Sequence, residues 1–327
     1  MSGVSEGVRV LNDHIDSANS NDKQKIIIFG ATGDQGKSVC KYLIEDGNWD
    51  VVGISRNPNS DSSKELKDIG VQVVKGDMGD PSSYAQALQG AYGAFVNADF
   101  WGPYFESGQN PTIASETESK YSRDAINECN KAELKHVIYS TLDELHDADV
   151  PHFQSKANVT KYIKATCLPT TYLYTSYYFS NATKFGQISK DKNDRLLLSI
   201  PAPDECLIPG YAVEQTGKWV LKALQNPNEF IGKDIQACSD IISVAQMAST
   251  LSDVAETKFD TLELSKEEFY SEDYKKKTDK EIWVNMEMFY RKLIRRDVAA
   301  SKKLVPDQWD FKQWAENSKE FRKVAGI

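Results

Sequence analysis

The sequence predicts an α/β protein built on a doubly wound parallel sheet, with a smaller, mostly helical lobe toward the C-terminus. Two observations predict this class. From Lys25 to Thr141, short apolar runs rich in β-branched residues alternate with segments of helical periodicity, a pattern typical of parallel strands joined by helices. After Thr141 the alternation loosens, and helical patterns dominate the remainder of the chain.

The first segments read strand, helix, strand. The run "KIIIF" predicts a buried strand, "KSVCKYLIED" a helix and "WDVVGIS" a second buried strand. The alternation then continues through four more strands, and the helix before the fourth strand begins at Pro81, a residue common at the first helical position. Further strands are expected at 71–77, 91–98, 134–141 and 169–176, and helices at 62–70, 81–90, 116–131 and 155–166.

The C-terminal half predicts helices at 213–225, 243–256, 265–275 and 279–294, a strand at 195–201 and a terminal helix at 307–316. Residues 1–23 are polar and acidic without a continuous periodic pattern, so we expect a disordered tail there. We therefore divide the chain into this tail, a core over 24–175 and a lobe over 176–327 that contributes discontinuously to the sheet.

Composition excludes several classes of function. Of 327 residues, 40% are hydrophobic and 27% charged, as in ordinary globular proteins, and no apolar run approaches the ~20 residues that span a bilayer. The net charge of −9 disfavours direct binding to nucleic acid. The N-terminus resembles neither a secretory signal nor a transit peptide, which predicts a cytoplasmic or nucleocytoplasmic protein.

The cysteines are an odd number and widely spaced, with no CxxC pair, as expected of reduced thiols. We therefore expect neither a metal site nor a disulfide framework. The five are Cys40, Cys129, Cys167, Cys206 and Cys238.

The strongest local signal is "GATGDQG", which follows the first strand and opens the first helix. Gly30 permits a tight turn, Gly33 lets the backbone approach a pyrophosphate, and Gly36 allows close helix packing. The helix N-terminus adds free N–H groups and a positive dipole. This placement predicts a Rossmann-type dinucleotide site in the 24–175 core.

The end of the second strand indicates which dinucleotide binds. An NAD site usually has an acidic residue there, whereas this chain has Ser55 and Arg56, which suit a 2′-phosphate. We expect NADP(H) in preference to NAD(H); the alternative is that Arg56 is a solvated loop cation. Asp77 and Met78, after the third strand, fit an adenine pocket, although Asp77 is equally typical of a turn.

With these motifs in order, the chain resembles the NmrA-like family of atypical short-chain dehydrogenase/reductase folds. The resemblance covers about residues 24–315 and includes "IIIFGATGDQGKSVCKYL", "VVGISRNP", "HVIYST", "SKANVTKYI" and "TTYLYTSYYFSN". It implies NADP(H) binding by a Rossmann domain and, in several members, a regulatory function exerted through transcription factors or changes of oligomeric state. Lys37 and Ser60 depart from the family, since a glycine and a second base are frequent at these positions.

The resemblance also implies a set of cofactor contacts. Carried over residue by residue, the contacts fall on Gly30, Thr32, Gly33, Asp34, Gln35, Arg56, Asp77, Met78, Ala98, Asp99, Phe100, Lys156, Tyr178, Phe179, Ser180 and Asn181.

The catalytic set of a short-chain reductase is incomplete. Such enzymes use a serine, a tyrosine proton donor and a lysine four residues after the tyrosine. Ser140 and Lys156 match two of these positions, but His152 replaces the tyrosine. A nearby cation would keep His152 neutral and able to relay a proton; the alternative is a loop residue preceding a helix. Lys156 is either a cofactor contact or a helix-surface lysine, and Tyr139 belongs to the core.

Two functions follow from these residues. The first is an NADP(H)-binding regulatory or redox-sensing protein, a monomer or homodimer that acts through a transcription regulator or signalling partner, with "DFWGPYF" (99–105) as a pocket wall or mobile flap. The second is an atypical NADPH-dependent reductase of a small carbonyl, quinone or enone, which would use Lys156 with Ser140 or His152.

Overall fold

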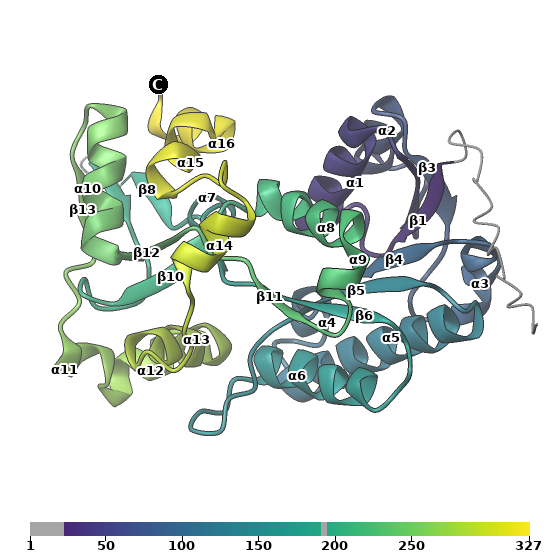
Figure 1. Ribbon diagram of the computed structural model, residues 1–327. Helices are drawn as coiled ribbons and strands as arrows, with labels where there is room; N and C mark the ends of the chain where they lie inside the picture. Colours follow the sequence, from purple (N-terminus) through teal and green to yellow (C-terminus); the bar gives the residue numbers. More distant parts are fainter. Residues whose placement is uncertain (1–22, 191–194) are drawn as a thin grey trace, which may run out of the picture.

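Seven parallel strands form the central sheet (Figure 1). The computed structural model describes residues 23–190 and 195–327, so the tail predicted over 1–23 lies almost wholly outside the described residues. The strand order is β11-β6-β5-β4-β1-β2-β3. Because the chain order reverses on the two sides of β1, the carboxyl ends of β1 and β4 frame a crevice of the kind that binds ligands in α/β proteins. The strands are β1 (Gln24–Ile28), β2 (Trp49–Ser55), β3 (Gln72–Lys75), β4 (Gly93–Val96), β5 (His136–Thr141), β6 (Thr170–Tyr174) and β11 (Asp234–Gln236).

Helices cover both faces of this sheet, as predicted for a doubly wound fold. Ile26 and Ile28 of β1 belong to a core cluster with side chains of α1, α2 and α8, while Ile27 packs in a second cluster with α3, α5 and α6. The alternation follows from the two-residue period of a strand. The helices are α1 (Asp34–Asp46), α2 (Asp61–Asp68), α3 (Ala85–Leu88), α5 (Pro111–Lys131), α6 (Pro151–Lys164) and α8 (Thr216–Gln225).

Helix α5 begins at Pro111, five residues before the predicted start at 116. The Asn110 side chain accepts hydrogen bonds from the backbone N–H groups of Thr112 and Ile113, and Pro111 occupies the first helical position. Both features favour a helix start. The extra turn carries Ala114 into the protein interior, beside the short helix α4 (Trp101–Glu106).

The C-terminal lobe contains two three-stranded sheets enclosed by helices around a core of its own. In this lobe α11, α12 and α13 lie on one side of the strands, and α15 and α16 lie on the opposite side (Figure 1). The strands are β7 (Tyr177–Tyr178), β8 (Ile188–Lys190), β9 (Leu196–Leu198), β10 (Leu207–Tyr211), β12 (Asp240–Ser243) and β13 (Phe259–Thr261). The helices are α7 (Asn181–Lys184), α9 (Pro227–Phe230), α10 (Val244–Ala255), α11 (Lys266–Phe269), α12 (Glu272–Lys277), α13 (Lys280–Tyr290), α14 (Val298–Leu304), α15 (Phe311–Asn317) and α16 (Lys319–Ala325), with 3₁₀ turns at Pro81–Ser83 and Val213–Gln215.

The chain returns from the lobe to the central sheet. Trp219 and Val220 of α8 are buried in the same cluster as α1, and Ile235 of β11 pairs with Leu173 at the edge of the sheet. The Trp219 indole N–H also donates to Ser301 Oγ of α14 at 3.3 Å. The lobe and the sheet are therefore joined by shared core as well as by chain connections.

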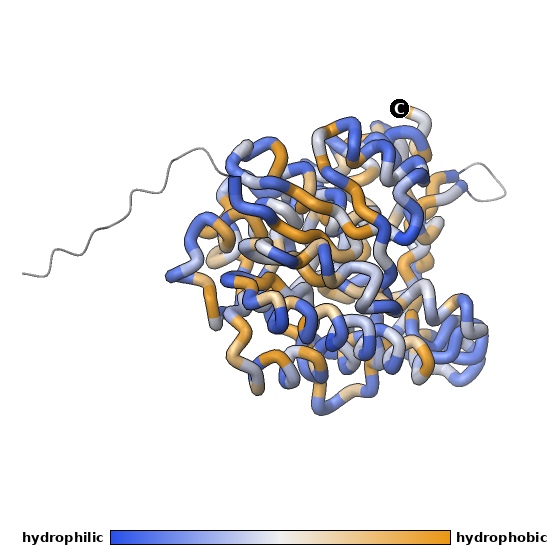
Figure 2. The backbone as a smooth tube through the Cα atoms, turned by 90° about the vertical axis from the view of Figure 1, so that its right-hand side faces the viewer, coloured by the Kyte–Doolittle hydropathy of each residue, from blue (hydrophilic) through white to orange (hydrophobic). Residues whose placement is uncertain are grey.

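Hydrophobic residues concentrate in the central strands, and hydrophilic residues occupy the outer turns of the helices (Figure 2). This distribution is typical of a globular core covered by amphipathic helices. Across 23–190 and 195–327, no helix is both long enough and apolar enough to cross a bilayer.

Candidate functional site

A cavity of about 560 Å³ lies at the carboxyl ends of the sheet strands, between the core and the lobe. It brings together most of the residues that the sequence singled out. Those lining it are Gly30, Thr32, Gly33, Asp34, Gln35, Arg56, Asp77, Met78, Ala98, Asp99, Phe100, His152, Lys156, Tyr178 and Asn181. Gly36, Ser140, Phe179 and Ser180 do not line it.

The glycine loop has the geometry that a pyrophosphate requires. Gly30 has φ +65°, and a Cβ there would meet the Asn97 carbonyl oxygen at 2.8 Å, while a Cβ on Gly36 would meet the Gly30 carbonyl oxygen at 2.1 Å. Gly33 is the N-cap of α1 and supplies no capping side chain. The first N–H groups of α1 have no side-chain cap, and Asp34 and Gln35 of this turn line the cavity, which suits a phosphate.

The departures at Lys37 and Ser60 have local structural roles. Lys37 pairs with Glu65 at 2.6 Å, and Ser60 caps α2 by accepting the Ser63 N–H. Neither side chain lines the cavity.

The far end of the cavity is formed by the ends of β2 and β3. Arg56 is exposed, and within the described chain it has no ion-pair partner. Asp77 lines the cavity while its Oδ1 accepts the Gly79 N–H at 2.8 Å, so the turn role and the cavity position coexist. A free guanidinium beside the buried Ser55 fits an anionic group here.

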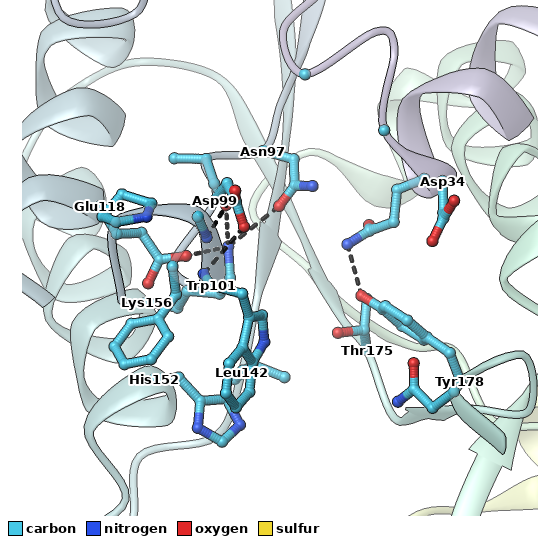
Figure 3. Close-up of a pocket in the computed structure, with 18 of the residues that line it drawn as sticks. Asp34, Asn97, Asp99, Trp101, Glu118, Leu142, His152, Lys156, Thr175 and Tyr178 are labelled. Atoms are coloured by element: carbon cyan, nitrogen blue, oxygen red, sulfur yellow. Dashed lines mark hydrogen bonds and ion pairs between the residues drawn. The ribbon is translucent and has the colours of Figure 1, made fainter. Parts of the chain in front are cut away.

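Lys156 of α6 is buried, and its ammonium is surrounded by oxygen atoms (Figure 3). Nζ lies 3.1 Å from Asn97 Oδ1, 3.1 Å from the Ala98 carbonyl oxygen and 3.0 Å from Glu118 Oε1. Glu118 is fully buried on α5 and also accepts a hydrogen bond from Ser155 Oγ. Lys156 is therefore a fixed, paired cation at the cavity wall.

Sequence reasoning missed Glu118. The signal available was its helical register, because Ala114, Glu118, Ser122 and Ala125 follow one another at spacings of four, four and three and share the buried face of α5. A carboxylate on a buried helix face indicates a buried cation partner. The sequence alone does not say which lysine that is.

Ser140 lies at the end of β5, fully buried behind Gln35. Its Oγ donates to Gln35 Oε1 at 2.9 Å, and Gln35 Nε2 donates to Tyr178 OH at 2.7 Å. This chain of hydrogen bonds connects β5, α1 and β7. It engages the Ser140 hydroxyl, the group that would polarise a substrate carbonyl in a short-chain reductase. Burial raises the pKa of Tyr178 to about 12, so its phenol stays protonated at neutral pH.

His152 lies in the first turn of α6, directly after Pro151, and not in a loop preceding the helix. Its Nδ1 lies 2.6 Å from Glu281 Oε1, which also accepts the His152 backbone N–H at 3.0 Å. Glu281 belongs to α13 of the lobe and is 2% exposed. The imidazole is thus oriented by a carboxylate distant in sequence, which the helical pattern of α13 did not predict.

Residues Trp101–Glu106 form helix α4, although Gly102 and Pro103 are residues typical of a turn. Asp99, which precedes the N-cap Phe100, accepts hydrogen bonds from Trp101 N and Gly102 N, each at 3.0 Å, so the first N–H groups of the helix are satisfied despite the glycine and proline. Tyr104 OH donates to Asp279 Oδ2 at the start of α13, at 2.9 Å. The segment is a cavity wall tied to the lobe.

Phe179 and Ser180 lie behind the cavity surface. Phe179 is fully buried and packs against Phe311 and Trp314, and Ser180 is buried just before α7. Tyr139 is also fully buried, and burial raises the pKa of its phenol, which confirms the prediction that Tyr139 belongs to the core.

Fold and cavity define a Rossmann-like protein whose crevice, glycine loop and open helix N-terminus fit a dinucleotide. The chain belongs to the NmrA-like family, whose model matches residues 22–314. It is 32% identical over 247 residues, 70% of this chain and 72% of the relative, to an NmrA-like family domain-containing oxidoreductase of Aspergillus campestris.

Solved structures share the fold at low identity. One is NmrA, a negative transcriptional regulator, in complex with NAD, with a TM-score of 0.76, 17% identity, and coverage of 93% of this chain and 98% of the other. Another is the triphenylmethane reductase of Citrobacter complexed with NADP(H), with a TM-score of 0.70, 16% identity, and coverage of 92% and 99%.

Proposed function

We propose that this protein binds NADP(H) in preference to NAD(H) and acts as a regulatory or redox-sensing protein through a cofactor-dependent protein partner, such as a transcription regulator in the cytoplasm or nucleus. The glycine loop and the open N-terminus of α1 would hold the pyrophosphate, and Arg56 the 2′-phosphate. When bound, the nicotinamide supplies or accepts a hydride. NmrA, which shares this fold, is described as a negative transcriptional regulator.

The observation that carries the proposal is that all three catalytic positions of a short-chain reductase are engaged elsewhere. Ser140 donates to Gln35 behind the cavity surface. His152, at the tyrosine position, is bound to Glu281. Lys156 forms an ion pair with Glu118, and this carboxylate offsets the effect that the ammonium charge would have on the pKa of a nearby proton donor.

A route from cavity to surface supports the sensing role. His152 is hydrogen-bonded to Glu281 of α13, and Tyr104 is hydrogen-bonded to Asp279 at the start of α13. Two walls of the cavity are therefore attached to one helix of the lobe. A cofactor that moves either wall would shift α13, and a partner that recognises one position of α13 would then bind in a cofactor-dependent manner.

A second candidate is an NADPH-dependent reductase of a small carbonyl, quinone or enone. The A. campestris relative is named an oxidoreductase, and part of the cavity is apolar, lined by Leu142, Ile282 and Met286. In this function Lys156 would orient the substrate, and His152 would donate or relay the proton.

Titration of the purified protein with NADP, NADPH, NAD and NADH, followed by an NADPH turnover assay on quinones, aldehydes and enones, separates the two candidates. The sensor hypothesis expects tight NADP(H) binding, trace turnover, and partner capture from an extract that depends on the cofactor. Sustained turnover that is lost in Lys156→Arg, which keeps a cation beside Glu118, would establish the reductase instead. Failure to bind any of the four dinucleotides would refute both.

A further inference from the structure

The lobe side of the cavity is lined by aromatic rings from several elements. These are Trp101 of α4, Phe153 of α6, Tyr177 of β7, Phe289 of α13 and Phe185, which follows α7. Trp101 and Phe185 lie 6.4 Å apart between ring centroids, and Tyr177 and Phe289 lie 6.3 Å apart. Phe185 is 51% exposed, so this end has a buried aromatic floor and an open aromatic rim, a surface suited to a flat ring.

The charges at this end are paired within the protein. Lys156 pairs with Glu118, and Lys184 of α7 pairs with Asp34, while the buried Glu281 accepts hydrogen bonds from the backbone N–H and Nδ1–H of His152. The exposed Glu106 adds a carboxylate to the lining. An anionic ligand would thus find no unpaired cation among the described residues that line this end of the cavity, so an uncharged ligand fits best.

His152 supplies one directed polar group beside these rings. Its ring lies 5.3 Å from Trp101 and 4.8 Å from Phe153, between centroids. Because Nδ1 contacts Glu281, a neutral imidazole donates from Nδ1 and presents Nε2 as an acceptor. Nε2 has no hydrogen-bond partner among the described residues and is not sealed from solvent, so it is available to a hydroxyl group in the cavity.

We propose that this aromatic end binds an uncharged, flat aromatic molecule bearing a hydroxyl group, with the hydroxyl donating to His152 Nε2 and Glu281 fixing the imidazole. The inference rests on the proposed function in one respect: the dinucleotide occupies the glycine-loop side and leaves this end open. It holds whether the bound molecule is an effector of the sensor or a reactant of the reductase.

The test uses 2-naphthol, naphthalene and 2-naphthoate as probes, with the full-length protein saturated with NADP. Calorimetry or quenching of tryptophan fluorescence measures each dissociation constant. We expect 2-naphthol to bind roughly threefold to tenfold more tightly than naphthalene, the value of one hydrogen bond, and 2-naphthoate to bind more weakly than 2-naphthol.

The variant His152→Asn tests the hydrogen bond between the ligand hydroxyl and Nε2. The asparagine amide can still donate to Glu281 in place of Nδ1, but the variant has no atom in place of Nε2. It should abolish the preference for 2-naphthol over naphthalene. Phe185→Ala, at the exposed rim, should weaken both probes by the same factor, and Leu262→Ala, at an exposed site outside the cavity, should change neither.

Several results would overturn the inference: no binding of the neutral probes, tighter binding of 2-naphthoate, competition of 2-naphthol with NADP, or an unchanged preference in His152→Asn. NADP affinity measured on the same samples distinguishes a failure of this inference from a failure of the proposed function. A protein that binds NADP but not 2-naphthol contradicts only this inference. A protein that binds 2-naphthol but not NADP contradicts only the proposed function.

Discussion

Lys156 and His152, four residues apart on α6, are each bound to a carboxylate from another helix, Glu118 of α5 and Glu281 of α13. Each carboxylate is at most 2% exposed. Removing one partner of such a pair leaves a buried charge and typically costs about 3–5 kcal/mol. Truncation of either α6 residue is thus a structural as well as a functional change, which is why conservative substitutions make the better tests.

Arg56 gives the clearest test of cofactor choice. Arg56→Ala should weaken NADP by about tenfold or more, because a charge-assisted hydrogen bond is worth ~1.5–3 kcal/mol, and should leave NAD nearly unchanged. Titration of wild type and variant with both dinucleotides measures this. Lys67→Ala, which removes an exposed lysine of α2 outside the cavity, is the control. Equal losses of affinity for NADP and NAD would show that Arg56 does not bind the 2′-phosphate.

His136 predicts how stability depends on acid. It is fully buried on β5, with Nε2 2.8 Å from Thr171 Oγ1, and burial lowers its pKa from 6.5 to about 4. Between pH 6.5 and pH 4, His136 is protonated in the unfolded chain but neutral in the folded chain. The free energy of unfolding therefore decreases as the pH falls from 6.5 toward 4. From pH 7 to pH 5 this group should remove roughly 2 kcal/mol of the free energy of unfolding.

Urea unfolding at pH 7 and pH 5 measures that loss. His136→Gln keeps an amide near the Nε2 position and does not titrate, so it should show a smaller difference between the two pH values. The same difference in variant and wild type would assign the acid sensitivity to other groups.

At the scale of elements, the hydrogen bond from Tyr104 OH to Asp279, the N-cap of α13, links α4 to α13. Helix α4 contains Gly102 and Pro103 and has only six residues, so its order depends on the hydrogen bonds to Asp99 and on this contact. Tyr104→Phe should lower the free energy of local opening by about 1 kcal/mol.

Hydrogen exchange in the α4 and α13 segments, followed by mass spectrometry, measures this opening with and without NADP. Exchange should accelerate in α4 and at the start of α13. Tyr290→Phe, which removes a comparable hydrogen bond to Glu205, should leave α4 unchanged. Acceleration confined to one of the two segments would argue against coupling.

The central elements could be predicted because their signals are local. A strand buried on both faces is a continuous apolar run, and the glycines of the first loop are required by a positive φ at Gly30 and by close packing at Gly36. Helix α4 could not be predicted, because hydrogen bonds to Asp99 satisfy its first N–H groups despite the turn propensity of glycine and proline. The early start of α5 was missed although its signal is local, because Asn110 is a typical N-cap and Pro111 a typical first helical residue.

At the scale of the whole molecule, the sheet is completed by a segment from beyond the predicted core. Helix α8 and strand β11 pack on and pair with the sheet. A fragment of residues 23–175 would expose the face that Trp219 covers and leave the edge of β6 unpaired. We expect it to show no cooperative urea transition. In a fragment of residues 23–237, which retains α8 and β11, the backbone amides of the sheet should be more protected from hydrogen exchange.

Near-UV circular dichroism and hydrogen exchange of the two fragments, compared with the full chain, check this expectation. A cooperative transition in the shorter fragment, with protected amides in β1 and β5, would mean that the core folds without the returning segment.

The sequence by itself determined the Rossmann-like sheet, the position of the phosphate loop and the replacement of the catalytic tyrosine by His152, because each depends on residues adjacent or periodic in the chain. Only the tertiary structure decided what these residues contact. Glu281 meets His152 across 129 positions of sequence, Gln35 separates Ser140 from the cavity, and aromatic rings from distant elements converge on one end of it. Such contacts arise when helices and strands pack together, and no local pattern specifies which buried groups will become partners.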